Sequence, residues 1–138
     1  MLQLCKMDGA DFPEEAELRE KVKTILNRHK TVPSCVHGDL WAGNFGATKE
    51  GDPVIYDPAF YFGDREVDIA MSKLFGSQSK AFYDAYNKTF PLADEWEIRE
   101  TIYNLYHILN HFVLFGGGYL SQGNMMIGKI LKYNYHSS

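Results

Sequence analysis

The segment that most constrains this chain runs from His37 to Asn44 and reads His-Gly-Asp-Leu-Trp-Ala-Gly-Asn. Val36 precedes it as the apolar end of a short strand would, and its two glycines permit a tight loop. A second apolar stretch, at residues 54–56, ends on Asp57. The pattern predicts a loop followed by a hairpin strand, an arrangement that brings Asn44 and Asp57 together.

Three oxygen-bearing side chains in this pattern, those of Asp39, Asn44 and Asp57, have the spacing of a phosphoryl-transfer site. In kinases an Asp accepts the proton of the substrate hydroxyl, and a following Asn and a further Asp hold magnesium against the phosphates of ATP. Magnesium prefers oxygen ligands and keeps several of its waters. We therefore predict that Asp39 is the proton acceptor and that Asn44 and Asp57 bind Mg²⁺ and, through it, ATP. The alternatives are an ordinary turn-forming Asp or Asn and an ordinary acid at a strand end.

Four blocks of the sequence closely resemble the fructosamine (ketosamine) kinases, which belong to the aminoglycoside-phosphotransferase-like branch of the protein-kinase-like fold. The most specific pieces are Trp41 in the catalytic loop and the Gly-Asp-Arg-Glu sequence that begins at Gly63. The resemblance extends over residues 2–131. The blocks are residues 37–44, 57–59, 63–71 and 104–110 with 114–119.

The resemblance implies an ATP-dependent phosphotransferase that acts on a hydroxyl of a ketoamine sugar attached to lysine or to a small amine. In that family, phosphorylation of the 3-hydroxyl destabilises the adduct and frees the amine, which amounts to protein deglycation. The expected partner is a ketoamine-modified protein or small molecule. Two alternatives remain: an aminoglycoside, choline or homoserine kinase-like activity, against which Trp41 argues, and a truncated lobe without catalysis.

A kinase of this type also needs an N-terminal lobe, in which a glycine-rich loop covers the phosphates and a strand lysine reaches them. The 36 residues before His37 contain neither feature and are predicted to form a loop and one helix. The glycines at 116–118 follow the catalytic loop and are better interpreted as a helix break than as a phosphate cradle. We therefore expect a single domain over residues 1–138 that resembles a C-terminal kinase lobe without its N-terminal lobe, incomplete and inactive by itself.

The rest of the chain is predicted to be mainly α-helical, around a small β-hairpin that carries the chemistry. Apolar residues at helical spacing and turn signals between them support this fold class. Phe82, Tyr83 and Tyr86 are expected to be buried. The predicted helices cover residues 13–29, 64–75, 80–87, 96–115 and 119–133, with a strand at 34–37 and a hairpin turn at 49–53.

His37 and Asp68 are predicted to support the catalytic loop. Histidine titrates near neutrality and could take part in catalysis, but in this fold class its position usually braces the loop. Asp68 lies among apolar residues of a predicted helix, where an unpaired charge is costly, so it needs hydrogen-bond donors. The resemblance implies that these donors lie on the His37 side of the loop, with Asp68 largely buried as an anchor and not a reactant.

Trp41, Asp64, Arg65 and Glu66 are candidate substrate contacts. Trp41 is either a core tryptophan or a flat wall against which the sugar or its attached amine packs. The charged residues 64–66 either form a surface ion pair, worth under about 1 kcal/mol, or present their acids to the cationic amine of a ketosamine.

Composition argues against several other classes of protein. Hydrophobic residues make up 45% and aromatic residues 14% of the chain, which is unlike a disordered protein. No apolar run reaches the roughly 20 residues of a membrane span. The formal net charge is −4 and Lys and Arg form no stripe, so we expect neither nucleic-acid nor membrane binding.

The cysteines and histidines give no strong metal signal. Cys5 and Cys35 are isolated, unlike the ligands of a zinc site, and a reduced, cytoplasmic location is expected. No signal peptide is visible at the start of the sequence. His107 and His111 lie one helical turn apart, but without a third ligand nearby they are better interpreted as packing or substrate-lining residues.

Overall fold

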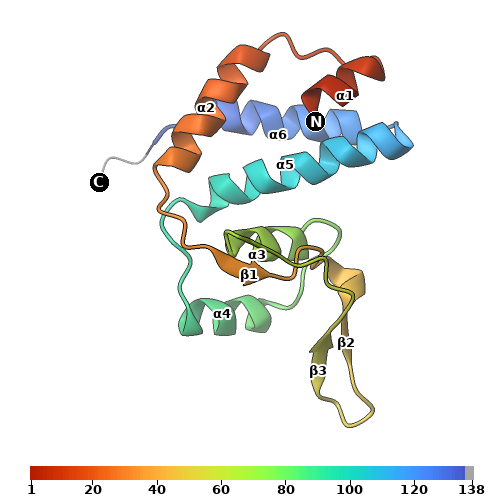
Figure 1. Cartoon of the computed structure of the whole chain (residues 1–138), viewed down its shortest axis with the longest axis vertical. Helices are drawn as coiled ribbons and strands as arrows, with labels where there is room; N and C mark the ends of the chain where they lie inside the picture. Colours follow the sequence, from red (N-terminus) through yellow and green to blue (C-terminus); the bar gives the residue numbers. More distant parts are fainter. Residues whose placement is uncertain (136–138) are drawn as a thin grey trace. The chain divides into compact units, whose positions relative to one another are not determined.

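The computed structural model describes residues 1–135, which form six α-helices, one 3₁₀-helix and four short strands (Figure 1). The chain divides into two compact units. The helical unit comprises residues 1–30 and 97–138, and the strand unit comprises residues 31–96. This content confirms the predicted fold class, mainly α with a small β component, whereas the prediction of one domain stays a prediction.

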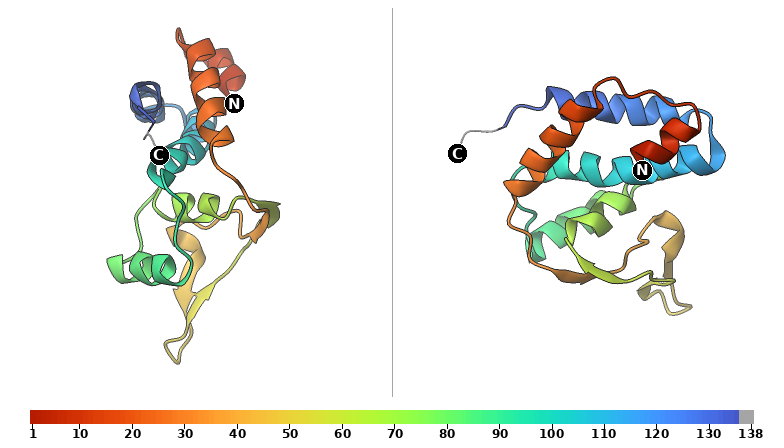
Figure 2. Two further views of the ribbon diagram at one scale, coloured as in Figure 1. Left: turned by 90° about the vertical axis from the view of Figure 1, so that its left-hand side faces the viewer. Right: turned by 45° about the horizontal axis from the view of Figure 1, so that its top comes forward.

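The helical unit is built around one apolar core. Its α5 and α6 are joined by a turn in which Gly116 and Gly117 both have a φ of +67°, and α2 packs against α6 (Figure 2). None of the helices within residues 1–135 has the length and hydropathy needed to cross a membrane. The helices are α1 (Leu2–Met7), α2 (Glu15–Asn27), α5 (Trp96–Phe115) and α6 (Tyr119–Lys132). The core residues are Cys5, Ala10, Phe12, Leu18, Ile25, Ile98, Leu105, Leu109, Ile127 and Ile130.

The strand unit contains two antiparallel pairs where one hairpin was predicted. The hairpin around the predicted turn consists of β2 (Phe45–Ala47), which was not predicted, and β3 (Pro53–Ile55), joined by residues 48–52. The predicted strand β1 (Ser34–Val36) pairs instead with β4 (Tyr61–Gly63), which the sequence analysis missed. A three-residue strand that ends in glycine is too short to give an alternating pattern, and only its partner makes it a strand.

Two helices complete the strand unit, α3 (Glu66–Ser72) and α4 (Lys80–Thr89). The α3 helix begins later than predicted because the Asp64 carboxylate accepts a hydrogen bond from the Glu66 N–H at 3.0 Å. Ser79 caps α4, its hydroxyl accepting from the Phe82 N–H at 3.2 Å. Between β1 and β2, the short 3₁₀-helix η1 (Ala42–Asn44) closes the motif loop.

The aromatic residues of α4 are less buried than predicted. Phe82, Tyr83 and Tyr86 are all half-buried, and α4 has no fully buried residue. The helix is covered on one side only: Phe82 meets the ring of Phe45 edge-on, and the Tyr83 hydroxyl lies 3.0 Å from the Ser72 hydroxyl. Aromatic residues at this spacing therefore mark a contact face and not an enclosed core.

Candidate functional site

The loop that begins at His37 is held against the segment that follows Asp57. The Ala59 N–H donates to the His37 carbonyl at 2.9 Å. Gly38, the next residue of the loop, has a φ of +87° and packs against Ala59. A Cβ atom on Gly38 would lie 2.2 Å from the Ala59 carbonyl oxygen. Only glycine fits this position, because a side chain would clash with the neighbouring backbone as well as disfavour the left-handed conformation.

The imidazole of His37 bridges the two segments. Its Nδ1 accepts from the Asp39 N–H at 3.2 Å, and its Nε2 lies 2.7 Å from the Tyr56 carbonyl oxygen. These partners require the tautomer with hydrogen on Nε2, since a backbone N–H can only donate and a carbonyl can only accept. Both ring nitrogens are thereby used within the protein, as the supporting role predicted for His37 requires.

Asp68 forms the predicted hydrogen bonds to this loop. Its Oδ2 accepts from the His37 N–H at 2.8 Å, and its Oδ1 accepts from the Gly38 N–H at 3.0 Å. The expectation that Asp68 is largely buried is wrong, because it is half-buried on α3. The apolar residues that follow it turn to the buried face of the helix, whereas Asp68 faces a loop that covers it only in part.

Tyr61 lies beside this anchor on β4. A Cβ atom on Gly38 would approach the Tyr61 ring at 3.3 Å. Burial raises the pKa of Tyr61, and the carboxylates of Asp68 and Asp64 raise this pKa further. The phenol therefore keeps its proton at neutral pH and adds no negative charge to this region.

Asn44, the last residue of η1, is hydrogen-bonded to Asp39, the predicted proton acceptor. Its side-chain nitrogen donates to the Asp39 carbonyl at 2.8 Å and to the Asp39 carboxylate at 3.3 Å, and only 6% of its surface is exposed. These bonds fix the amide orientation, with the nitrogen towards Asp39. The amide oxygen has no donor within residues 1–135 and can serve as a neutral oxygen ligand for a cation.

Asp57 occupies an unusual backbone conformation. Its φ is +53°, in the left-handed region, and Pro58 follows it. Tyr56, the residue before Asp57, is held by both of its backbone polar groups: its N–H donates to the Asn44 carbonyl at 3.1 Å, and its carbonyl lies 2.7 Å from the His37 Nε2. The exposed Asp57 carboxylate makes no hydrogen bond to the described residues. The donor set, one amide oxygen and one carboxylate, suits Mg²⁺; that both oxygens reach one ion stays a prediction.

Trp41 is exposed, so the interpretation as a core tryptophan is wrong. Its exposed fraction is 41%. The indole ring lies over Gly43, where a Cβ atom would stand 2.2 Å from the ring atom Cη2. The glycine thus lets the ring fold back over η1, next to Asn44, with one face open to solvent.

Arg65 is directed to α4 and not to a neighbouring acid. Arg65 donates to the Tyr86 hydroxyl at 3.0 Å and to the Phe90 carbonyl at 2.9 Å, and its guanidinium carbon lies 3.6 Å from the centroid of the Phe90 ring. Arg65 therefore fastens the start of α3 to the end of α4. Glu66 is only 5% exposed and Asp64 is half-buried. Their substrate contacts stay a prediction.

His107 and His111 are packing residues in the described structure. The His111 Nδ1 lies 2.7 Å from the His107 carbonyl, within the same helix. The His111 ring also lies 5.3 Å, between centroids, from that of Tyr119, and the His107 ring lies 5.5 Å from that of Tyr106. Because the His111 Nδ1 donates to a carbonyl, this nitrogen is not available to a metal ion.

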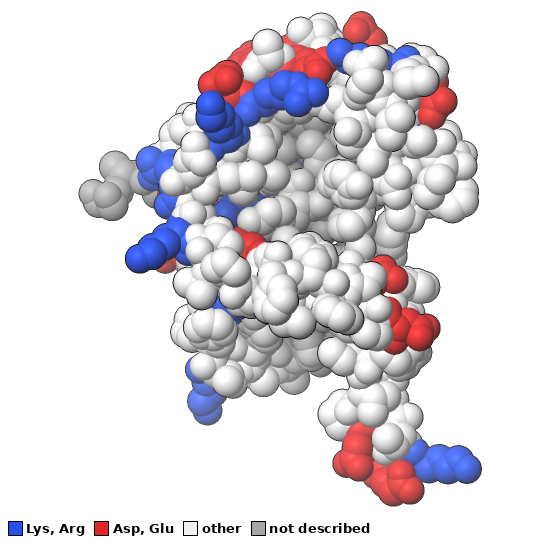
Figure 3. All heavy atoms as spheres, in the orientation of Figure 1, with Lys and Arg blue, Asp and Glu red and all other residues white. Residues whose placement is uncertain are grey.

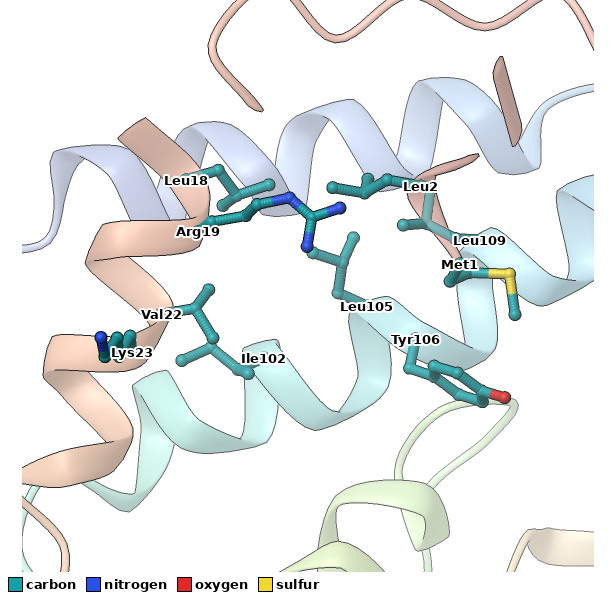
Figure 4. Close-up of a pocket in the computed structure, with 10 residues that line it drawn as sticks. All are labelled: Met1, Leu2, Leu18, Arg19, Val22, Lys23, Ile102, Leu105, Tyr106 and Leu109. Atoms are coloured by element: carbon teal, nitrogen blue, oxygen red, sulfur yellow. The ribbon is translucent and has the colours of Figure 1, made fainter. Parts of the chain in front are cut away.

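The helical unit has an apolar pocket of about 340 Å³ that contains none of the predicted site residues. Arg19 reaches from α2 into the space between α1 and α5 (Figure 4). Its guanidinium is bound to Glu15 at 2.9 Å. The pocket is lined by Met1, Leu2, Leu18, Arg19, Val22, Lys23, Ile102, Leu105, Tyr106 and Leu109.

Tyr56 also lies at the site, although the sequence pattern predicted it only as the end of an apolar strand. Its hydroxyl donates to the Gly43 carbonyl at 2.9 Å, beside Asn44. The residue type at position 56 could have indicated this role. A tyrosine immediately before Asp57 brings a hydroxyl that can hydrogen-bond near a metal ligand, whereas an aliphatic strand residue has no such group.

Known proteins share both the sequence and the fold of this chain. The family model described as "Fructosamine kinase" matches residues 1–133. Proteins named "Probable ketoamine kinase" are 47% identical over 131 residues in Synechocystis sp. and 48% identical over 132 residues in Vibrio parahaemolyticus. These alignments cover 95% and 96% of this chain but 44% and 46% of the relatives. The chain therefore spans less than half the length of the curated relatives it matches.

Solved structures agree with this relationship. A crystal structure described as a "Putative fructosamine-3-kinase" from Haemophilus somnus 129PT superposes with a TM-score of 0.83 at 35% identity, over 94% of this chain and 45% of that chain. A second, from Thermobifida fusca, gives a TM-score of 0.80 at 34% identity, over 96% and 47% of the two chains. By its sequence, its fold and the match over residues 1–133, this chain belongs to the fructosamine kinase family.

Proposed function

We propose that this chain carries the proton acceptor and the metal ligands of an ATP-dependent kinase that phosphorylates a hydroxyl of a ketoamine sugar. The observation that carries the proposal is one hydrogen-bonded assembly: the Asn44 side-chain amide donates to Asp39, and the Asn44 carbonyl accepts from the N–H of Tyr56, the residue before Asp57. The names of the relatives support a ketoamine as the substrate class. We propose that this ketoamine is carried on lysine or on a small amine.

In this proposal Asp39 accepts the proton of the substrate hydroxyl as the γ-phosphoryl group leaves ATP. The Asn44 amide donates to one carboxylate oxygen, Oδ2, at 3.3 Å, and we assign the other oxygen, Oδ1, to the substrate hydroxyl. Phosphoryl transfer depends mostly on positioning and on stabilisation of charge, so a fixed carboxylate is worth more than a strongly basic one.

The Asn44 amide oxygen and the Asp57 carboxylate would hold Mg²⁺. When bound, the ion neutralises the negative charge of the phosphates. The protein contributes one charged and one neutral oxygen, which leaves the other coordination positions for phosphate oxygens and water. The hydrogen bonds to Asp39 and Tyr56 keep Asn44 in place before any ion binds.

The exposed face of Trp41 provides a wall for the sugar or for its attached amine. Trp41 immediately precedes η1, its ring lies over Gly43, and its side chain is exposed to solvent. Asp64 is the better candidate to meet a cationic amine, because Glu66 is buried and Arg65 is committed to α4. Phosphorylation of the sugar destabilises the adduct and frees the amine, so the proposed physiological result is deglycation.

The proposal includes an N-terminal kinase lobe as a necessary partner. A glycine-rich loop and a strand lysine hold the triphosphate in kinases, and the 138 residues contain neither before His37. We therefore expect negligible turnover from the 138-residue chain, because nothing in it aligns the γ-phosphoryl group with Asp39.

Joining the chain to the N-terminal half of the Vibrio parahaemolyticus relative tests the proposal. The joined protein should phosphorylate fructosyl-lysine with ATP, as followed by ³¹P NMR. Asp39→Asn should lower turnover by at least about 100-fold, the scale of general-base catalysis. Asp52→Asn, at an exposed acid in the hairpin turn, is the matched control and should leave turnover unchanged. Undiminished turnover of Asp39→Asn would contradict the assigned base, and substantial turnover by the 138-residue chain would contradict the need for the other lobe.

A further inference from the structure

We propose that Tyr56 is a positioning residue of the metal site, which ties the turn that carries Asn44 to the segment that carries Asp57. The inference rests on the proposed function, since it concerns the two residues assigned there as ligands. It adds a residue that lies outside the sequence motif and that contacts backbone atoms on both sides of Asn44.

The hydroxyl of Tyr56 spans the turn around Asn44. It donates to the Gly43 carbonyl at 2.9 Å and lies 3.3 Å from the Phe45 carbonyl. These two carbonyls belong to the residues immediately before and after Asn44. A single phenol thus holds the backbone on both sides of one proposed ligand.

The backbone of Tyr56 completes the connection. Its N–H donates to the carbonyl of Asn44 itself at 3.1 Å, so the carbonyls of residues 43, 44 and 45 all face Tyr56. Its own carbonyl lies 2.7 Å from the His37 ring. Asp57 is the next residue in the chain. Asn44 and Asp57 therefore cannot separate without breaking bonds to Tyr56.

Burial does not explain the presence of a tyrosine at this position. Tyr56 is 44% exposed, and all three residues of the neighbouring strand β3 are exposed. The tip of the hairpin carries a group of charged side chains, and the surface between this tip and the rest of the unit is mostly uncharged (Figure 3). A hairpin with so little apolar burial is held mainly by hydrogen bonds, and the last β2–β3 pair, Phe45 with Ile55, lies directly before Tyr56.

The phenol extends this pairing by one residue, at the point where the hairpin leads into the metal site. Its ring lies along β2, where a Cβ atom on Gly46 would stand 3.1 Å from the Tyr56 Cε1 atom. Phenylalanine would fill the same space without the bonds to Gly43 and Phe45. Residues that orient metal ligands typically change metal affinity by about 10-fold to 100-fold when mutated. We expect Tyr56→Phe to weaken metal binding by about 10-fold.

Binding of Mn²⁺ to the 138-residue chain tests the inference without requiring turnover. Free Mn²⁺ is measured by its EPR signal during titration of the wild type, Tyr56→Phe, Asp57→Asn and Tyr106→Phe. Tyr106 is 56% exposed on α5 and provides the matched loss of a phenol hydroxyl. The wild type and Tyr106→Phe should bind Mn²⁺ equally, Tyr56→Phe about 10-fold more weakly, and Asp57→Asn should lose the binding.

The variants separate failure of the inference from failure of the proposed function. If Asp57→Asn loses binding and Tyr56→Phe matches the wild type, the role of Tyr56 is refuted and the metal site stands. If the wild type binds no Mn²⁺, or if Asp57→Asn binds normally, both the metal site and the inference fail. Circular dichroism and thermal unfolding serve as the structural control: a Tyr56→Phe defect that comes with loss of helical signal would make Tyr56 a folding residue and also refute the inference.

Discussion

Asp57 has a left-handed backbone conformation and is followed by a proline. Substitutions at Asp57 can therefore change the stability of the protein and its metal binding independently. The left-handed region costs most residues roughly 1–2 kcal/mol, whereas Asn and Asp visit it more readily. Asp57 has a φ of +53°. Asp57→Asn should therefore keep nearly the whole stability of the wild type, whereas Asp57→Ala should lose about 1 kcal/mol of it. Urea denaturation measures this difference.

Both Asp57 variants should lose Mn²⁺ binding, because each removes the charged oxygen. Equal stability of the Ala and Asn variants would show that the backbone at this position carries no strain. The comparison thus tests the conformation independently of the metal site.

The contacts that could be predicted from the sequence are those that follow from neighbouring residues or from a recognised motif. Asp68 had to find donors because it lies among apolar residues, and the loop N–H groups of His37 and Gly38 supply them. The partners of Arg65 could not be predicted, since they are a hydroxyl and carbonyls on a different helix that only the fold brings close. The bonds of Tyr56 to carbonyls 11 and 13 residues away depend in the same way on the register of the hairpin.

Among the secondary-structure elements, α1 illustrates how a short helix is held by one buried side chain. Cys5 is fully buried, and its thiol donates to the Leu109 carbonyl at 3.6 Å. Burial raises the pKa of Cys5, a nearby Asp8 raises it further, and the N-terminal amine opposes both effects. The folded state therefore holds the thiol proton more strongly than the unfolded state does.

The two cysteines should consequently differ in reactivity. Cys35 is exposed on β1 and should react readily with iodoacetamide at pH 8, whereas Cys5 should react only when α1 detaches. The stabilising effect of the Cys5 proton is present in full below the ordinary pKa of a thiol and is lost as the pH rises through the raised pKa of the folded state. Mass spectrometry of the wild type and Cys35→Ser checks this, and rapid labelling of Cys5 in folded Cys35→Ser would contradict it.

Element length decides which helices and strands could be predicted. The longest helix, α5, has the predicted bounds, Trp96–Phe115, because its apolar residues repeat over 20 residues. The hairpin turn was predicted at residues 49–53 from Gly51 and Pro53, and it lies at residues 48–52, with Pro53 as the first residue of β3. In contrast, α1 has six residues and β4 has three, too few for either period to be recognised. Both depend on partners distant in the sequence, Leu109 for α1 and β1 for β4.

At the scale of the whole molecule, the strand unit contains every residue to which we assign a catalytic or metal-binding role. Asp39, Asn44 and Asp57 all lie within residues 31–96, as do His37 and Asp68, which hold the loop. Metal binding can therefore be measured on the 138-residue chain, without the N-terminal lobe that the proposed turnover requires.

The position of a bound cation on the chain is the sharpest test of the metal site assigned to Asn44 and Asp57. Fe²⁺ with ascorbate and hydrogen peroxide produces hydroxyl radicals that cut the backbone close to the bound ion, and Fe²⁺ accepts the oxygen ligands assigned to Mg²⁺ here. We expect cuts within residues 37–44 and 56–59, located by mass spectrometry, and we expect Asp57→Asn to lose them. Cuts that persist in Asp57→Asn, or that concentrate on α5 near His107 and His111, would contradict the assigned metal site.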